Sequence, residues 1–517
     1  MTSPPLDMNA PATARADRRV GALLCLFYLW VVLRNAWLCE DSFISFRVVD
    51  NFLHGLGLRW NPLERVQVYT HPLWLLCVSA VTFATRDVYS AAMGLGVACS
   101  VAAVALVVFR TGATTYDRVV VVAVLAFSKA FVDYSTSGLE NPLSHLLVAL
   151  FLVEYLRARP RLGWMVLWAG LGLTDRMDLV WCFLPPLVHV AWKARALRPR
   201  RWRAWLGLAP FVAWEGFALL YYGFLFPNSA YAKLGVHIPA RDMMNQGGAY
   251  LLNSLSWDPL TLFAIGVALL AACAGWRRDR KLVSVAAAIA LHLAYLVRVG
   301  GDYMSGRFLS VPLLEAAVIL SRVRLVRPLD LAAALGVALA LGVAGRRVPL
   351  MTSDAYGGLG KSPQGVDDEM GWRFDDTALL RLNREHSLAD RGGWIADGIK
   401  ARRDGARVVV YRNVGYFGFF AGPRVHVLDP YGIGDPLIAR MPFDPSMGPW
   451  EAGHYLRAVP DGYPQAALDE GRLADDALEA YWRKLELVTR GRLLDPARLR
   501  LVARFNLGLE PPPAAAR

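Results

Sequence analysis

The sequence predicts a polytopic α-helical membrane protein with about eleven transmembrane helices, followed by a C-terminal extracytoplasmic α/β domain. Of the 517 residues, 55% are hydrophobic and 19% charged, with a mean hydropathy of +0.33, which is too apolar for a soluble protein of this size. Apolar segments recur from Val20 to about Val343 and then stop. Arg-rich stretches separate them, so we assign the formal net charge of +13 to membrane orientation.

A helix that crosses a bilayer needs about 20 apolar residues, and about 17 are tolerated. The apolar segments predict helices near 20–38, 88–109, 118–134, 142–156, 162–175, 179–193, 205–226, 259–276, 282–299, 307–321 and 329–345. One more apolar segment, 72–85, is short, and we expect it to lie in the interface or to re-enter without crossing.

The basic loops predict the topology. If the N-terminus is cytoplasmic and 72–85 does not cross, all the Arg-rich loops lie inside, as the positive-inside rule requires. We therefore expect a multi-pass protein of the plasma membrane with a cytoplasmic tail (1–19), a transmembrane domain (20–345) and an extracytoplasmic domain (346–517). The first apolar segment lacks a small-residue cleavage site, so it reads as an anchor.

Two classes of site are not indicated. The six cysteines all precede residue 346 and show no CxxC or Cys/His spacing, which argues against a zinc site or a disulfide framework. No RNA-binding signature accompanies the basic residues, and we expect no nucleic-acid partner.

The loops on the outer face are unusually polar. Charged side chains at the edge of lipid are costly and commonly face a cavity, so together these loops predict a large polar pocket that opens outward. Their sequences are "CEDSF", "SGLENP", "TDRMD", "FPNSAYAK" and "GGDYMSGR".

Such a pocket suits glycosyl transfer from a lipid carrier, because nucleotide sugars are absent outside the membrane. A polyprenyl phosphate that carries one sugar would deliver the activated donor. The reaction needs a carboxylate base for the acceptor hydroxyl, donors for the phosphate leaving group, and an apolar groove for the lipid tail.

Glu40 and Asp41 supply the carboxylate. Adjacent residues at a helix end point in different directions, so one can face the pocket while its neighbour pairs locally. We choose Asp41 as the base and Glu40 as the second candidate, with Arg34 as a partner for either. The alternative is simple polarity at a helix end, with Arg47 as the salt-bridge partner.

Cations that could hold the phosphate are His71, Arg176, Lys233 and Arg307. Each has a simpler reading as a cation that lies at the membrane interface. A further pair, Lys129 and Asp133, is spaced four residues apart and predicts mutual neutralisation.

Other outer-loop residues are candidates for sugar recognition. Asn141 and Asn228 lie next to prolines and could recognise hydroxyl groups, or they could cap helices. Asp302 follows two glycines, where the backbone can approach a ligand closely. Asp178 could equally cap the next helix.

A metal site is less clearly indicated. Asp41, Asp302 and His71 could form a hard-ligand site for Mg²⁺, Mn²⁺ or Ca²⁺, although no ligand motif of fixed spacing supports it. We expect no obligatory cofactor, because Arg and Lys can stabilise a phosphate leaving group alone.

Several sequence motifs resemble those of a known family. "EDSFISFR" and "FLHGLGLRWNPLERVQVYTHPLW" resemble the first outer loop, here 39–87, of a group of GT-C membrane glycosyltransferases. That group includes the mycobacterial and corynebacterial terminal β-(1→2)-arabinofuranosyltransferases. His71 stands where relatives usually have Asn. Weaker matches over residues 40–440 are "SGLENPL", "GLTDRMD", "FPNSAYAKLG", "GGDYMSGRFLSVPLL" and "VHVLDPYGIGDPLIARMP".

The resemblance implies a GT-C fold enzyme whose acidic pair holds the catalytic carboxylate. The implied donor is decaprenylphosphoryl-arabinofuranose, and the acceptor is the non-reducing end of cell-wall arabinan. The matched motifs add Arg47, Tyr69, Glu140 and Asp429 to the expected substrate-binding residues.

Two other functions stay open. Some relatives on a GT-C-like scaffold are non-catalytic membrane-assembly or flagellar-control proteins, and the intact acidic pair argues against that reading. A transporter of polyprenyl lipids would be expected to show repeats and broken helices at the midplane. The sequence has no internal repeat.

The region after residue 345 reads as mixed α/β. "ARVVVY" and "RVHVLD" have strand character, and "LADDALEAYWRKLELV" has helical spacing. Four aromatics between the strands belong to a packed core or stack on sugar rings, and they are Tyr416, Phe417, Phe419 and Phe420.

Overall fold

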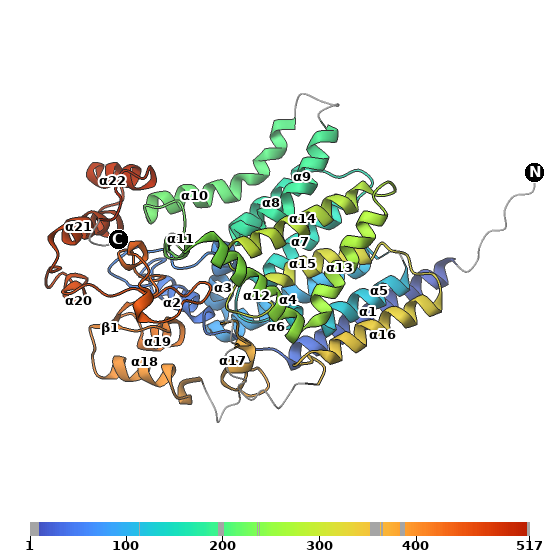
Figure 1. Cartoon of the computed structure of the whole chain (residues 1–517), viewed down its shortest axis with the longest axis horizontal. Helices are drawn as coiled ribbons and strands as arrows, with labels where there is room; N and C mark the ends of the chain where they lie inside the picture. The colour runs from blue at the N-terminus through green and yellow to red at the C-terminus, as the bar shows by residue number, and fades with distance from the viewer. Residues whose placement is uncertain are drawn as a thin grey trace, which may run out of the picture.

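The computed structural model describes residues 10–112, 114–194, 201–234, 236, 238–351, 362, 365–382 and 388–513. The chain is built almost wholly of helices (Figure 1). The helices up to residue 344 are α1 Ala10–Arg34, α2 Ser42–Leu53, α3 Pro72–Thr85, α4 Val88–Arg110, α5 Thr115–Phe127, α6 Lys129–Asp133, α7 Asn141–Leu156, α8 Leu162–Asp175, α9 Val180–Ala194, α10 Ala209–Tyr221, α11 Asn228–Leu234, α12 Ala240–Trp257, α13 Pro259–Ala274, α14 Arg280–Arg298, α15 Ser310–Leu320 and α16 Pro328–Ala344. The later elements are α17 Glu369–Thr377, α18 Trp394–Arg403, β1 Val408–Val410, α19 Val414–Ala421, β2 His426–Leu428, α20 Tyr463–Ala466, α21 Asp476–Arg490 and α22 Pro496–Asn506. Short 3₁₀ helices are Met177–Leu179, Arg201–Leu208, Arg307–Leu309, Leu388–Asp390, Ile438–Arg440 and Pro445–Met447.

Several helices begin and end close to their predicted positions. The segments 72–85, 88–109 and 162–175 form α3, α4 and α8. Other features differ from the prediction: α1 ends at Arg34 rather than 38, the segments 205–226 and 307–321 begin as 3₁₀ helices, and α2 and α11 were not predicted. The predicted helix 118–134 is interrupted at Ser128, whose side chain accepts from the backbone N–H of Phe131 and so caps α6. The polar helix α12 was not predicted.

Helix length tests only part of the predicted topology. Among the described residues, three helices are long and apolar enough to cross a membrane, and they are Val88–Arg110, Trp202–Tyr221 and Arg280–Arg298. A fourth crossing is possible if α12 and α13, bent by 109° at their junction, act together. The count of about eleven crossings stays a prediction.

The apolar helices share one core. Side chains from α1, α4, α5, α7, α9, α13, α14 and α15 pack together in it. In Figure 1, α1, α5 and α16 lie side by side at one end of the molecule, and α18–α22 gather at the other end. The bundle is therefore capped at one end by α18–α22 of the C-terminal region (Figure 1).

The C-terminal region is anchored on the first outer loop through a second core. Phe43 and Trp60 of the loop lie in one buried cluster with Ile395 and Phe417 of the C-terminal region. The two predicted strands form a parallel pair, with Val408 opposite His426. The rest of the described C-terminal region is helix and irregular structure.

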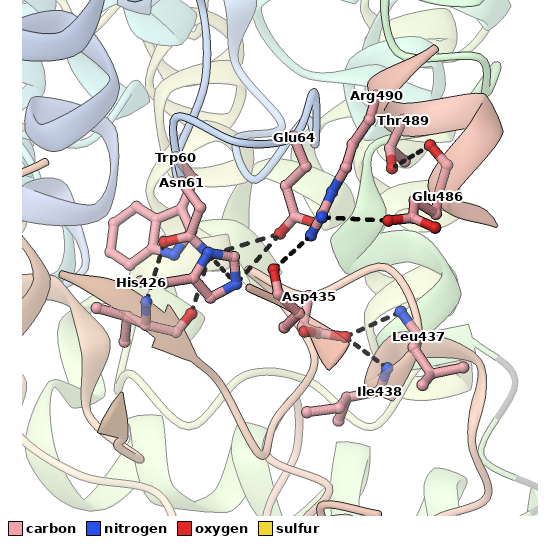
Figure 2. Close-up of polar contacts among 12 residues, drawn as sticks. Trp60, Asn61, Glu64, His426, Asp435, Leu437, Ile438, Glu486, Thr489 and Arg490 are labelled. Carbon is pink, nitrogen blue, oxygen red and sulfur yellow. Dashed lines mark hydrogen bonds and ion pairs between the residues drawn. The ribbon is translucent and has the colours of Figure 1, made fainter. Parts of the chain in front are cut away.

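A polar network also joins the two parts (Figure 2). The amide of Asn61 donates to the carbonyl of Val427 and accepts from its N–H, both at 3.0 Å. The buried carboxylate of Glu64 lies 3.6 Å from the guanidinium of Arg490. The backbone N–H of Arg65 donates to the carbonyl of Thr489. Residues 60–65 are thus held between β2 and α21.

Candidate active site

A cavity of about 390 Å³ lies where the first outer loop meets the C-terminal region. The acidic pair forms part of its wall, as the sequence predicted. The carboxylates that line it are Glu40, Asp41, Asp367, Glu369, Asp429 and Glu451. The rings that line it are Tyr303, Trp372, Trp394, Tyr431 and His454.

Asp41 presents its carboxylate to this cavity. The residue occupies the N-cap position of α2, but its side chain makes no capping hydrogen bond. Instead, Oδ2 accepts a hydrogen bond of 3.0 Å from the hydroxyl of Tyr303. A carboxylate has two oxygens with several lone pairs, so this one donor leaves capacity to accept from a substrate hydroxyl.

Glu40 is used differently. It is 5% exposed, and its Oε1 accepts from the backbone N–H groups of Gly415 at 2.7 Å and Tyr416 at 3.1 Å. Burial, followed by the neighbouring charge of Asp41, raises the pKa of Glu40 to about 8. The predicted partner Arg34 instead donates to the carbonyl of Leu350. One acid, Asp41, thus faces the cavity, and its neighbour Glu40 bonds locally to backbone N–H groups. Arg34 pairs with neither acid.

A buried ion cluster forms around Glu140. Its Oε1 lies 3.0 Å from Arg307 Nη2 and 3.3 Å from Arg176 Nη1, and its Oε2 lies 3.1 Å from His71 Nδ1. Although burial opposes the effect, Arg307, His71 and Arg176 hold the pKa of Glu140 well below its usual range. We call these residues the Glu140 cluster.

Two further acids extend the Glu140 cluster. Asp302 Oδ2 lies 3.4 Å from Arg307 Nη1, and Asp178 Oδ2 lies 2.5 Å from Arg176 Nη2. The structure therefore brings together six predicted site residues from four outer segments, and they are His71, Glu140, Arg176, Asp178, Asp302 and Arg307.

Asn141 and Lys233 lie at the edges of this region. The amide nitrogen of Asn141 donates to the carbonyl of Arg307 and to Ser310 Oγ. Lys233 Nζ lies against Gly453, a residue of the segment that carries Glu451 and His454 of the cavity wall. Burial raises the pKa of Asp302, and the charges of Arg307 and Lys233 oppose that rise.

Of the predicted site residues, Glu40, Asp41 and Asp429 line the cavity, while the Glu140 cluster, Asn141 and Lys233 lie outside its lining. Three further predicted residues outside the lining bond to the fold. Arg47 is buried, and its guanidinium donates to the carbonyls of Trp60, Gly418 and Val425. The hydroxyl groups of Tyr69 and Tyr222 hydrogen-bond at 2.6 Å. Asn228 donates to the carbonyls of Gly432, Ile433 and Asp435. A role of Arg47, Tyr69 or Asn228 in substrate binding stays a prediction.

Asp429 does line the cavity. Its carboxylate accepts from the backbone N–H groups of Tyr431, Ile433 and Gly434. Burial raises the pKa of Asp429 to about 6, and these three bonds oppose the rise. The side chain therefore holds the loop that carries Tyr431 into the cavity wall.

The sequence analysis did not predict most of the residues that the C-terminal region contributes to the cavity lining. Arg373 lies 4.2 Å above the ring of Trp394 and 3.3 Å from Glu369, and burial raises the pKa of Glu369 to about 7. The His454 ring meets Tyr303 edge-on at 4.3 Å and Tyr431 at 4.8 Å. Tyr303 and Tyr431 fall in matched motifs, whereas Glu369, Arg373, Trp394 and His454 are scattered singly along the C-terminal region.

The structure tests the predicted metal ligands only by geometry. Within the described part of the chain, no group of three or more His, Cys, Asp and Glu side chains is arranged to hold a metal ion. His71 contacts Glu140 through Nδ1 and Ser45 Oγ through Nε2, at 2.8 Å for the latter. Both ring nitrogens of His71 are thus engaged, and the metal requirement stays a prediction.

Two curated proteins are similar to this chain, and each is named a terminal beta-(1->2)-arabinofuranosyltransferase. The protein from Corynebacterium glutamicum is 27% identical over 56% of this chain and 48% of its own length. The protein from Mycobacterium tuberculosis is 29% identical over 57% of this chain and 53% of its own length. The chain spans about half the length of these relatives. No family model and no solved structure matches it. The resemblance predicted from the motifs is confirmed.

Proposed function

We propose that this chain is a membrane glycosyltransferase that transfers arabinofuranose from a polyprenyl-phosphate donor to an extracytoplasmic cell-wall glycan. The donor would be decaprenylphosphoryl-arabinofuranose and the acceptor the end of an arabinan chain. The similarity to two proteins named as arabinofuranosyltransferases supports the reaction class. The observation that carries the proposal is the carboxylate of Asp41 at the cavity, hydrogen-bonded to Tyr303.

In the proposed reaction Asp41 is the general base. It takes the proton from an acceptor hydroxyl, whose oxygen forms the new bond to the anomeric carbon. The bond between that carbon and the phosphate oxygen breaks, and polyprenyl phosphate leaves. Direct attack by the acceptor inverts the anomeric configuration, whereas a second carboxylate acting first as a nucleophile would retain it.

The phosphate would bind near the Glu140 cluster. Arg176 and Arg307 are already paired with acids, so the phosphate would share them, with Lys233 and His71 adding positive charge. The proposal requires no cofactor. If a divalent cation such as Mg²⁺, Mn²⁺ or Ca²⁺ binds, Asp41 and Asp302 are the acids to hold it, and it would offset phosphate charge.

The proposed location is the plasma membrane, with about eleven crossings and a cytoplasmic tail at 1–19. The transmembrane domain would comprise residues 20–345, and residues 346–517 would lie outside, where the cavity can meet the glycan. Basic residues on the loops assigned to the cytoplasm support this orientation.

A panel of polyprenyl-phosphate sugars, each with a labelled sugar, tests the proposal on purified protein. We expect release of polyprenyl phosphate and labelled arabinan only with the arabinofuranose donor, and no turnover by Asp41→Asn. Turnover of a different sugar would change the substrate. Equal rates for wild type and Asp41→Asn would overturn the mechanism.

One observation favours a second function. The 109° bend between α12 and α13 is the kind of broken helix found in transporters of lipids and solutes. A flippase would move the intact donor lipid across a vesicle bilayer without releasing sugar. A non-catalytic assembly protein would neither move the lipid nor release sugar. An assay in vesicles that follows both lipid movement and sugar release therefore separates glycosyltransferase, flippase and assembly protein.

A further inference from the structure

The cap of helix α19 comes from the first outer loop. The first N–H groups of any α-helix lack partners within the helix. Asn413, at the N-cap position, makes no side-chain hydrogen bond to them. Glu40, 375 positions earlier in the chain, accepts from the N–H of Gly415 at 2.7 Å. It also accepts from Tyr416 at 3.1 Å.

The approach is so close that only glycine fits at position 415. A Cβ added to Gly415 would lie 2.2 Å from the carbonyl oxygen of Glu40 and 2.7 Å from its Oε1. One of these atoms belongs to the backbone, which cannot swing aside as a flexible side chain can. The pairing of Glu40 with α19 is therefore built into both segments.

Helix α19 in turn carries part of the cavity wall. Asn413 and Val414, at its beginning, line the cavity. Its middle is held on α2, where Arg47 donates to the carbonyl of Gly418 at 2.6 Å. In its first turn the ring of Tyr416 lies 4.8 Å from that of Phe43, and the backbone N–H groups of Gly415 and Tyr416 are bonded by Glu40.

We propose that Glu40 is a positioning residue. Its carboxylate fastens the first turn of α19 to the first outer loop and so places the cavity wall beside Asp41, which alone acts on the substrate. The importance of this wall for sugar transfer rests on the proposed function. The fastening itself does not.

The two roles open to Glu40 respond differently to one substitution. A Gln side chain keeps a carbonyl oxygen that accepts from both N–H groups, but it cannot take a proton. Glu40→Gln therefore preserves a cap and removes a base, whereas Glu40→Ala removes both.

Hydrogen exchange on the full-length protein in detergent tests the fastening without any substrate. In Glu40→Ala we expect protection of the Gly415 and Tyr416 amides to fall about 10- to 100-fold, as suits the loss of two buried hydrogen bonds. In Glu40→Gln we expect protection close to wild type. Unchanged protection in Glu40→Ala would overturn the inference.

Turnover of the polyprenyl-phosphate donor tests whether the position of α19 matters for sugar transfer. We expect Glu40→Gln to retain most turnover, and Glu40→Ala and Gly415→Ala to lose it. Gly415→Ala disturbs the contact between α19 and Glu40 while keeping both carboxyl groups in the chain, so it covers the case in which Glu40→Ala fails to fold. Gly94→Ala is the matched control, because nothing lies within 4 Å of the added Cβ.

The outcomes separate the two proposals. If Glu40→Gln is as inactive as Asp41→Asn while its amide protection is intact, Glu40 takes part in the chemistry and the positioning role is wrong. If wild type turns over no donor, the proposed function fails, and the exchange data still decide whether Glu40 fastens α19.

Discussion

The hydroxyl of Tyr303 donates a 3.0 Å hydrogen bond to Oδ2 of Asp41 across 262 positions of the chain. Both residues line the cavity, and Asp302 beside Tyr303 contacts Arg307 of the Glu140 cluster. This bond therefore joins the proposed base to the segment that would face the phosphate. A base and a leaving-group site need such a fixed relation for transfer of the sugar.

Asp41→Asn should lower kcat by about 10²- to 10⁴-fold, because the amide has the same size but cannot accept the proton. Binding of the donor lipid should persist. Turnover and donor binding measured on the same preparation check both parts. Asp50→Asn is the control, since Asp50 lies exposed on the same helix, and a parallel loss there would point to general damage of α2.

Tyr303→Phe should reduce kcat about tenfold and leave the KM for the donor unchanged. The substitution removes only the hydroxyl that orients Asp41, and a hydrogen bond to a charged group contributes about 1.5–3 kcal/mol. Steady-state kinetics with the labelled donor measure the split. Tyr116→Phe, remote from the cavity lining, should change neither constant. A rise in KM alone would assign Tyr303 to donor binding.

Glu140→Gln should lower the free energy of unfolding at pH 7 by about 3–5 kcal/mol, because it leaves buried positive charges without their partner. The folded pKa of Glu140 lies well below its usual range. Its contribution is therefore present above the unfolded pKa of about 4.3 and is lost as the pH falls through the folded value.

Denaturation of wild type and Glu140→Gln at pH 7 and at pH 3 measures this difference, which should shrink in acid. Glu154→Gln is the control, because Glu154 pairs with the exposed Arg157 and Arg161 and should cost less. Equal losses at both pH values would contradict a charge effect.

Trp372→Ala should raise the KM for the acceptor about 3- to 10-fold without changing the KM for the donor. The ring lines the cavity and is 43% exposed, which suits stacking on a sugar at a value of about 0.5–1.5 kcal/mol. Acceptor titrations check it. Trp276→Ala removes a ring of similar exposure away from the cavity and should have no effect.

Cysteine labelling should establish the orientation. In a Cys273→Ser background, Asp461→Cys should react with an impermeant thiol reagent from outside intact cells, and Arg159→Cys should react only after lysis. Both positions are exposed, and the basic loop around Arg159 is expected to be cytoplasmic. Reversed labelling would contradict the topology.

The sequence predicted helices best where local signals suffice. Apolar segments bounded by Pro72, Asp87 and Arg110 end where α3 and α4 end. The break at Ser128 was missed because the apolar pattern runs through it. That break is stabilised by Asp258, which accepts from Ser128 Oγ and from the N–H of Ala130. No local pattern shows such a partner.

In the candidate site, too, the sequence predicted some residues and missed those that depend on distant contacts. The cations His71, Arg176 and Arg307 were predicted to serve one phosphate site, whereas Glu140, which joins them in the structure, came only from a matched motif. The wall from the C-terminal region, with Arg373 and Trp394, depends on how a distant segment docks, and single residues carry no signal for that. A matched motif also does not show whether a residue in it binds substrate or only stabilises the fold. The guanidinium of Arg47, inside the most specific motif, bonds to three backbone carbonyls.

The span between Glu40 and α19 also has a consequence for biosynthesis. Residues 40 and 415 meet only after nearly every helix between them has been made, and contacts so distant in sequence form late. A copy halted before residue 413 would carry every expected membrane segment and both acids, yet one side of its reaction chamber would be missing. Incomplete chains in the bilayer would then be inactive, and the proposed activity would require translation beyond residue 413.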